Sequence, residues 1–265
     1  MLQYSPRQDG YGTVLRLHKK GLILTERTQT YRHALVLCDG EKPSVEQLHA
    51  LRMEDTLVIA ADGGGNIGKD WEIRPDLIIG DLDSDDGSWP DVKRLYDPDQ
   101  DTNDLEKALD YAHVQGVSRI TIIGGTGERL DHTLKNLSVM VRYKEAFEGL
   151  VLLDNYMKAR LISSPFTMST WTGMKVSLVA ASGKVTGIVS EGLLYPWSGQ
   201  DLIVGHYDGT SNQATGEQVT LRFEEGDLLL IVPLDGQSCR VAQDGQLGHD
   251  GPPGHAEQPS AGSIS

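Results

Sequence analysis

The sequence is poor in cysteine, has no long apolar run and carries far fewer basic than acidic residues. Its two cysteines, Cys38 and Cys239, are too few for a disulfide framework or a thiolate zinc site. No run of about eighteen apolar residues occurs, so we expect no membrane span. The net charge of −14 argues against a nucleic-acid-binding surface, which would need a basic face. Because the first thirty residues lack the apolar core of a signal peptide, we expect a cytoplasmic protein.

Residues 31–150 contain short apolar runs that each stop at glycine or aspartate, as buried parallel strands do. The runs cover residues 34–38, 56–61, 76–79 and 119–123. Apolar residues at helical spacing mark two helices, with Leu105, Ala108, Leu109 and Ala112 on the first and Leu130, Leu134, Leu137 and Val141 on the second. Strands that alternate with helices predict an open, mostly parallel α/β sheet, with ligands beyond the carboxyl ends of its strands.

Residues 151–234 show a different pattern, of short strands with no strong helix. The expected strands cover residues 151–153, 159–162, 175–179, 217–223 and 228–232. This spacing predicts an all-β domain, most simply a sandwich. Residues 1–30 are expected to be an N-terminal extension with one strand at 13–15, and residues 235–265 a flexible tail.

Two acidic loops are the strongest chemical signal. Asp81 and Asp83 follow an apolar run, while Asp99, Asp101 and Asp104 lead into a helix. Carboxylates gathered at such an edge repel one another unless a cation lies between them, and oxygen ligands with substrate phosphates suit Mg²⁺. Either loop alone is more typical of a solvated turn, because aspartate is common in turns. Together they favour a metal–nucleotide site.

Two glycine loops add the features of a phosphate site. The first covers residues 62–66 and ends a strand; the second, residues 124–132, follows a strand and opens a helix. Glycine lets backbone N–H groups approach phosphate oxygens, and Arg129 offers a planar donor. Asp131 fits a ligand role or a helix cap equally well, and His132 is better read as an exposed first-turn residue than as a base.

Three further features have an ordinary reading beside the functional one. Lys107 lies one helical turn after Asp104. It could form a surface ion pair with Asp104, or its ammonium could bind a phosphate. Tyr195 and the polar run 209–213 could hold a flat heterocycle, or could be a core aromatic and a polar loop.

The order of these motifs closely resembles that of the thiamine pyrophosphokinase family, from about residue 33 to residue 234. The resemblance implies transfer of a pyrophosphoryl group from ATP to the hydroxyl of thiamine, giving thiamine diphosphate and AMP. It also implies Mg²⁺, an N-terminal α/β catalytic domain, a C-terminal thiamine-binding β-sandwich, and a homodimer with its active site at the subunit interface.

The resemblance also implies roles for individual residues. The catalytic carboxylates are Asp81, Asp83, Asp101, Asp104 and Asp131, of which Asp81, Asp83 and Asp104 are the metal ligands. The nucleotide and substrate contacts are Asp62, Gly63, Gly64, Asn66, Gln100, Lys107, Gly124, Gly125 and Arg129. The thiamine-side residues are Tyr195, Thr210, Ser211 and Asn212. Either Asp101 or Asp131 could orient the thiamine hydroxyl or accept its proton.

Four positions depart from the family pattern. Asn103 stands where threonine is usual, Glu128 where glycine is usual, Gly65 where alanine is common, and Gly209 where serine is common. Two alternatives remain open. One is an enzyme on the same scaffold that acts on another substrate, as a pyrophosphokinase or phosphohydrolase. The other is a non-catalytic nucleotide or thiamine sensor, which Glu128 and Asn103 favour slightly.

Overall fold

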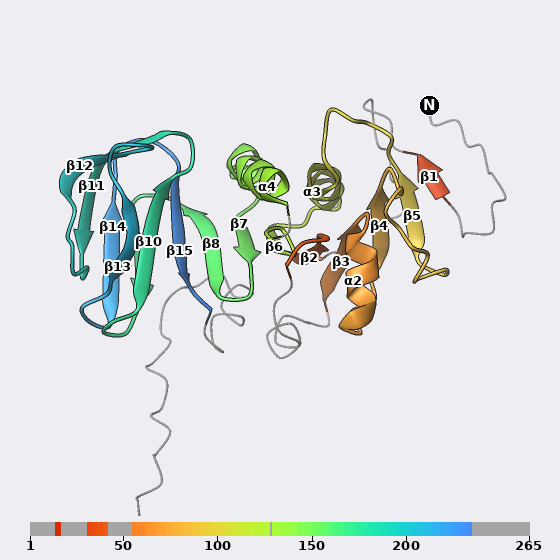
Figure 1. Cartoon of the computed structure of the whole chain (residues 1–265), viewed down its shortest axis with the longest axis horizontal. Helices are drawn as coiled ribbons and strands as arrows, with labels where there is room; N and C mark the ends of the chain where they lie inside the picture. Colours follow the sequence, from red (N-terminus) through yellow and green to blue (C-terminus); the bar gives the residue numbers. More distant parts are fainter. Residues whose placement is uncertain (1–13, 17–30, 42–54, 128, 235–265) are drawn as a thin grey trace, which may run out of the picture.

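The computed structural model describes residues 14–16, 31–41, 55–127 and 129–234. Within them, strands form an eleven-stranded sheet and a four-stranded sheet (Figure 1). The large sheet has the order β1-β5-β4-β3-β2-β6-β7-β8-β15-β10-β13 and the small one the order β12-β11-β14-β9. The predicted fold class, an open α/β sheet followed by a β-sandwich, is confirmed.

The first part of the large sheet is parallel throughout. Its strands are β1 (Val14–Arg16), β2 (His33–Leu37), β3 (Thr56–Ala61), β4 (Leu77–Gly80), β5 (Lys93–Tyr96), β6 (Arg119–Ile123) and β7 (Gly149–Leu153). Strand order reverses between β2 and β6, because β3 and β4 extend one way from β2 while β6 and β7 extend the other. In open α/β sheets such a reversal leaves a crevice at the carboxyl ends of the strands, where ligands bind.

Helices cover both faces of this parallel sheet. Helices α3 (Asp104–Val114) and α4 (Leu130–Tyr143) pack on one face through residues such as Leu109 and Met140. Helix α2 (Gly64–Asp70) packs on the other through Ile67. Among the described residues, no helix is long and apolar enough to cross a membrane. The cytoplasmic location stays a prediction.

Antiparallel pairing begins where β7 meets β8, and residues 157–233 build a sandwich. Its strands are β8 (Met157–Ile162), β9 (Phe166–Ser169), β10 (Lys175–Ala180), β11 (Lys184–Glu191), β12 (Ser198–Ile203), β13 (Gly209–Gln213), β14 (Gln218–Arg222) and β15 (Leu228–Pro233). Val176 and Leu230 of the large sheet share one core with Val185 and Val219 of the small sheet. This interlocking of two inner faces is what defines a sandwich.

One buried histidine ties the parallel strands together. The imidazole of His33 makes hydrogen bonds to the hydroxyls of Thr56 (3.2 Å) and Thr121 (2.9 Å) on the two strands that flank its own. Burial, helped by Arg119, lowers the pKa of His33 to about 4. The ring is therefore neutral at physiological pH.

The apolar face predicted for the second helix is wrong in part. Helix α4 lies where its pattern places it, but Leu130 and Leu134 are 72% and 58% exposed. Val139, Met140 and Tyr143 face the core instead. The N-terminal half of α4 thus leaves an apolar surface uncovered in the single chain.

Candidate active site

Three carboxylates meet at the carboxyl edge of the parallel sheet. Asp62 directly follows β3, Asp81 directly follows β4, and Asp104 is the first residue of α3. One ligand atom from each lies within 4.8 Å of the others. Gly80 makes this approach possible, because a Cβ there would lie 2.8 Å from the Cβ of Asp62 and 3.0 Å from an oxygen of Asp104.

Asp62 is the most constrained of the three carboxylates. It has a left-handed backbone (φ 46°), and its N–H donates to the carbonyl of Ile79 (2.9 Å). Its Oδ2 accepts from the N–H of Ser84 (3.1 Å), whereas its buried Oδ1 has no hydrogen-bond partner. Burial, with Asp104 close by, raises the pKa of Asp62 to about 6. A buried carboxylate oxygen without a hydrogen-bond partner, beside two other acids, fits a binding site for a cation.

Asp81 is held in place by a neutral donor. The side-chain amide of Gln100 donates to its Oδ2 (3.0 Å), and this bond lowers the pKa of Asp81. Asp83 is exposed and accepts from the hydroxyl of Ser84 (3.0 Å). The sequence grouped Asp83 with Asp81 and Asp104, while the structure brings Asp62 into the tight group and leaves Asp83 at its edge.

Lys107 supplies the positive charge next to this group. Its ammonium lies 2.9 Å from Asp104, and its side chain is only 3% exposed. The pair is therefore not the ordinary surface bridge that helical spacing alone would favour. A buried ammonium of this kind offsets part of the carboxylate repulsion.

The first glycine loop is shaped by close backbone packing. A Cβ at Gly64 would lie 2.0 Å from the carbonyl of Leu37, and one at Gly63 would lie 2.7 Å from Asp39. Asn66 donates to the carbonyl of Ser84 (2.8 Å) and accepts from the N–H of Asp86 (3.1 Å). Asn66 thus anchors the loop that carries the Ser84 amide, an arrangement that the sequence did not reveal.

The second glycine loop lies where β6 ends, beside the end of β2. Gly124 has a left-handed backbone (φ +67°) and its carbonyl accepts from the N–H of Gly40 (2.8 Å). Arg129 and Asp131 form an exposed two-point ion pair (3.2 and 2.6 Å), which lowers the pKa of Asp131 to about 2. Gly125, the next residue of the loop, is buried. Asp131 lies in the first turn of α4, whose N-cap is Arg129.

Two other residues predicted near this site, Asp101 and His132, are exposed to solvent. Asp101 lies in the loop before α3, and the exposure of His132 is as expected for a first-turn residue. Glu128 lies outside the described residues.

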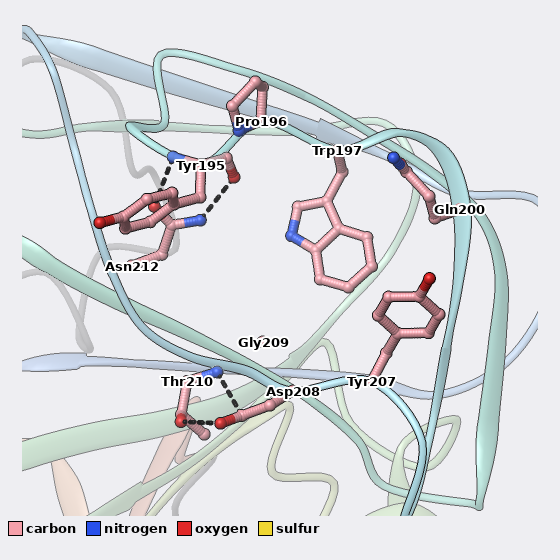
Figure 2. Close-up of a pocket in the computed structure, with 9 residues that line it drawn as sticks. All are labelled: Tyr195, Pro196, Trp197, Gln200, Tyr207, Asp208, Gly209, Thr210 and Asn212. Carbon is pink, nitrogen blue, oxygen red and sulfur yellow. Dashed lines mark hydrogen bonds between the residues drawn. The ribbon is translucent and has the colours of Figure 1, made fainter.

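Three of the four residues expected to contact thiamine, Tyr195, Thr210 and Asn212, line a pocket in the sandwich. The pocket has a volume of about 270 Å³ (Figure 2). It is lined by Tyr195, Pro196, Trp197, Gln200, Tyr207, Asp208, Gly209, Thr210 and Asn212. Asn212 accepts from the N–H of Tyr195 (3.1 Å) and donates to its carbonyl (2.7 Å), so it fixes that wall. Ser211 is exposed beside the pocket but does not line it.

Tyr195 is 67% exposed, so it is not a core aromatic. The run from Gly209 is a strand, β13, rather than a loop. Sequence reasoning missed Tyr207 and Asp208, which directly precede the polar run, and Gln200, which reaches the pocket from β12.

The two sites lie far apart within one chain. Figure 1 shows α2 and β4, beside the carboxylates, toward one end of the molecule's longest axis, with β12 and β13 at the other end. One continuous sheet, which runs from β1 to β13, lies between the two sites.

Comparisons with known proteins agree with this architecture. Residues 48–151 match the family described as thiamin pyrophosphokinase, catalytic domain. Thiamin pyrophosphokinase 1 of Caenorhabditis elegans is 28% identical over 194 residues, which cover 67% of this chain and 79% of the relative. Thiamine pyrophosphokinase 2 of Arabidopsis thaliana is 27% identical over 255 residues, which cover 82% and 92%. The chain is thus similar to thiamine pyrophosphokinases over most of its length, and the match to the family's catalytic domain covers residues 48–151.

Solved structures share the fold over nearly their whole length. The crystal structure of thiamine pyrophosphokinase from Bacillus subtilis superposes with a TM-score of 0.67 at 23% identity, covering 77% of this chain and 99% of that one. The yeast thiamin pyrophosphokinase structure gives a TM-score of 0.65 at 15% identity, covering 84% and 92%.

Asn103, where the family pattern has threonine, is well accommodated. Its side chain caps α3 by accepting from the N–H of Glu106 (3.0 Å), and Glu106 bonds back to its N–H (3.1 Å). Its amide also donates to Asn136 (3.0 Å), which in turn donates to the carbonyl of Gly125 (2.9 Å). Asparagine thus keeps the cap and adds a link between the acidic loop and the glycine loop.

The two glycine departures differ in their packing. A Cβ at Gly209 would lie 2.5 Å from the carbonyl of Leu178, so glycine lets β13 approach β10 closely. A Cβ at Gly65 would lie 3.2 Å from Ile78, which a small shift of that side chain could relieve.

Proposed function

We propose that the protein transfers the pyrophosphoryl group of ATP to the hydroxyl of thiamine, with release of AMP, in a Mg²⁺-dependent reaction. The observation that carries the proposal is the group formed by Asp62, Asp81 and Asp104 beside Lys107, in a chain similar to thiamine pyrophosphokinases. The α/β part, residues 31–150, would take the nucleotide, and the sandwich, residues 151–234, would take thiamine.

The carboxylate group has the chemistry of a magnesium site. It offers oxygen donors only, and one oxygen of Asp62 is buried without a hydrogen-bond partner. Asp62, Asp81 and Asp104 would hold the ion. Asp83 lies in the same loop as Asp81, at the edge of this group. When bound, Mg²⁺ supplies charge neutralisation of phosphate oxygens.

The chain's own residues would position the reactants and offset charge. Lys107 keeps its ammonium fixed beside Asp104. Arg129 is exposed at the glycine loop, where its guanidinium pairs with the carboxylate of Asp131. A guanidinium binds phosphate with the same bidentate geometry, so Arg129 could leave Asp131 and bind phosphate oxygens of ATP. Asp101 and Asp131 remain the two candidates for orienting the thiamine hydroxyl and accepting its proton.

An assay of AMP release tests the activity. We expect AMP and thiamine diphosphate in equal amounts, only when ATP, thiamine and Mg²⁺ are all present. Asp104→Asn should lower kcat by about 10²-fold or more while the protein stays folded. ATP consumption that does not depend on thiamine, or release of ADP instead of AMP, would contradict the proposal.

We propose a homodimer in which the pocket of one subunit faces the carboxylates of the other. Two observations support this: the separation of the sites in one chain, and the exposed apolar residues Leu130 and Leu134 next to Arg129. Contiguous exposed apolar side chains are typical of association surfaces.

Mixing two impaired variants tests this arrangement. Asp104→Asn damages only the carboxylate site, and Tyr195→Ala damages only the pocket. If the site is shared, random exchange of subunits should restore about a quarter of the wild-type activity, because half the dimers are mixed and each has one intact site. A mixture no more active than the sum of its parts would place both substrates on one subunit.

A further inference from the structure

The pocket in the sandwich has an unusual charge balance. Three of its lining residues are aromatic, namely Tyr195, Trp197 and Tyr207. Among the described residues that line it, Asp208 is the only one charged at neutral pH, and no lysine or arginine is present. The wall chemistry is therefore aromatic and anionic.

The carboxylate of Asp208 is fixed in direction. Its Oδ1 accepts from the N–H of Thr210 (2.8 Å) and its Oδ2 from the hydroxyl of the same residue (3.0 Å). These bonds lower the pKa of Asp208, so the side chain is ionised at physiological pH. Figure 2 shows Asp208 and Thr210 on one side of the pocket, with Tyr195 and Trp197 across from them.

Such a pocket favours a flat cation over a neutral ring of the same shape. The faces of aromatic rings attract positive charge, most strongly where water is partly excluded. A fixed carboxylate at the same opening adds a Coulomb attraction that no nearby cation of the lining cancels. Trp197 is 9% exposed, so one aromatic of the pocket is already shielded from bulk water.

We infer that Asp208 is a specificity-determining residue, which selects the positively charged thiazolium ring of thiamine over an uncharged ring of equal shape. The inference rests on the proposed function, because it takes thiamine as the pocket's ligand. A purely local role, in which Asp208 only shapes the turn before β13, is the competing reading.

Asp208→Asn separates the two readings. Asparagine keeps a carbonyl oxygen for the N–H of Thr210 and nearly the same volume, but it removes the charge. The matched control is Glu217→Gln, which removes one negative charge from an exposed position in the sandwich that does not line the pocket.

The probes are thiamine and its thiophene analogue, in which carbon replaces the quaternary ring nitrogen and the hydroxyl is kept. Titration calorimetry on the full chain gives the Kd of each. We expect Asp208→Asn to weaken thiamine binding about 3- to 10-fold, with binding of the analogue changed less than about twofold. Glu217→Gln should leave both values unchanged. The wild-type preference for thiamine should also shrink with added salt, since charges near the surface are screened.

An equal loss for both compounds would show a structural role and overturn the inference, as would no loss for either. Failure of the proposed function has a different signature. If the wild type binds both compounds without turning either over, the enzymatic proposal fails while the Kd ratios still decide the role of Asp208. If the wild type binds neither compound, the thiamine pocket itself is wrong and both proposals fall.

Discussion

Replacing Asp62 by asparagine should stabilise the metal-free protein and abolish its activity. Asp62 is 4% exposed, has one oxygen without a hydrogen-bond partner and lies beside two other carboxylates. Asparagine keeps an acceptor for the N–H of Ser84. It also places an N–H₂ group where the unpartnered oxygen was, facing Asp81 and Asp104.

The size of the effect follows from the pKa of Asp62, which rises from 3.8 to about 6. One pKa unit corresponds to about 1.4 kcal/mol, so the ionised side chain destabilises the fold by up to about 3 kcal/mol. Asp81 and Asp104 are only half-buried, and solvent there screens the repulsion. We therefore expect Asp62→Asn to raise the free energy of unfolding by about 1–2 kcal/mol at pH 7.5.

The gain should depend on pH in a defined direction. The folded pKa lies above the unfolded one, so between pH 4 and pH 6 the unfolded chain loses this proton first. Wild-type stability from this group is fully present below about pH 4 and is lost as the pH rises to about 6. The advantage of the variant should accordingly vanish near pH 4.

Urea unfolding in EDTA at pH 7.5 and pH 4 measures both effects. A parallel titration with Mg²⁺ should stabilise the wild type but not the variant, because an ion that binds only the folded state adds its binding free energy. A variant that is less stable than the wild type at pH 7.5, or whose gain is the same at both pH values, would refute the reasoning.

Three further changes have distinct expected outcomes. Gly80→Ala would push a methyl group against Asp62, so we expect a loss of about 1–3 kcal/mol in chemical unfolding together with loss of thiamine-dependent AMP release; unchanged activity would show that the carboxylates need not meet. Arg129→Ala should raise the KM for ATP about tenfold and change stability by less than about 0.5 kcal/mol, because the side chain is exposed; an unaltered KM would remove Arg129 from the nucleotide site. His33→Gln should reduce acid lability: the folded pKa of about 4 lies below the ordinary 6.5, so the wild type loses up to about 3 kcal/mol as the pH falls from 6.5 to 4, a loss that unfolding curves of the variant should lack.

The sequence predicted the fold best where the apolar pattern alone decides the structure. Continuous apolar runs such as 56–61 became fully buried strands, and the face of α3 marked by Leu105 and Leu109 is buried as expected. Strand β5 was not predicted, because its buried Arg94 looks like a surface residue until Asp85 is seen to pair with it.

The site was predictable where motifs end an element, and not where it depends on contacts across elements. Asp81 and Asp104 could be placed at the sheet edge from their position after a strand and before a helix. That Asp62 rather than Asp83 completes the tight group depends on a left-handed turn and on the Ser84 amide, neither of which has a sequence signature. Asp208 belongs to the pocket only because β13 starts beside the loop after β11.

The join between β7 and β8 has a consequence for anyone who cuts or recombines this chain. The two strands pair directly, from Val151 with Arg160 to Leu153 with Lys158. A fragment that ends after β7 would expose an apolar strand edge, and the complementary fragment starting at β8 would expose another. Unprotected edges of this kind attract further strands, so separate halves should aggregate rather than fold as modules. Chimaeras with relatives are better built by exchanging loops within one half than by trading halves.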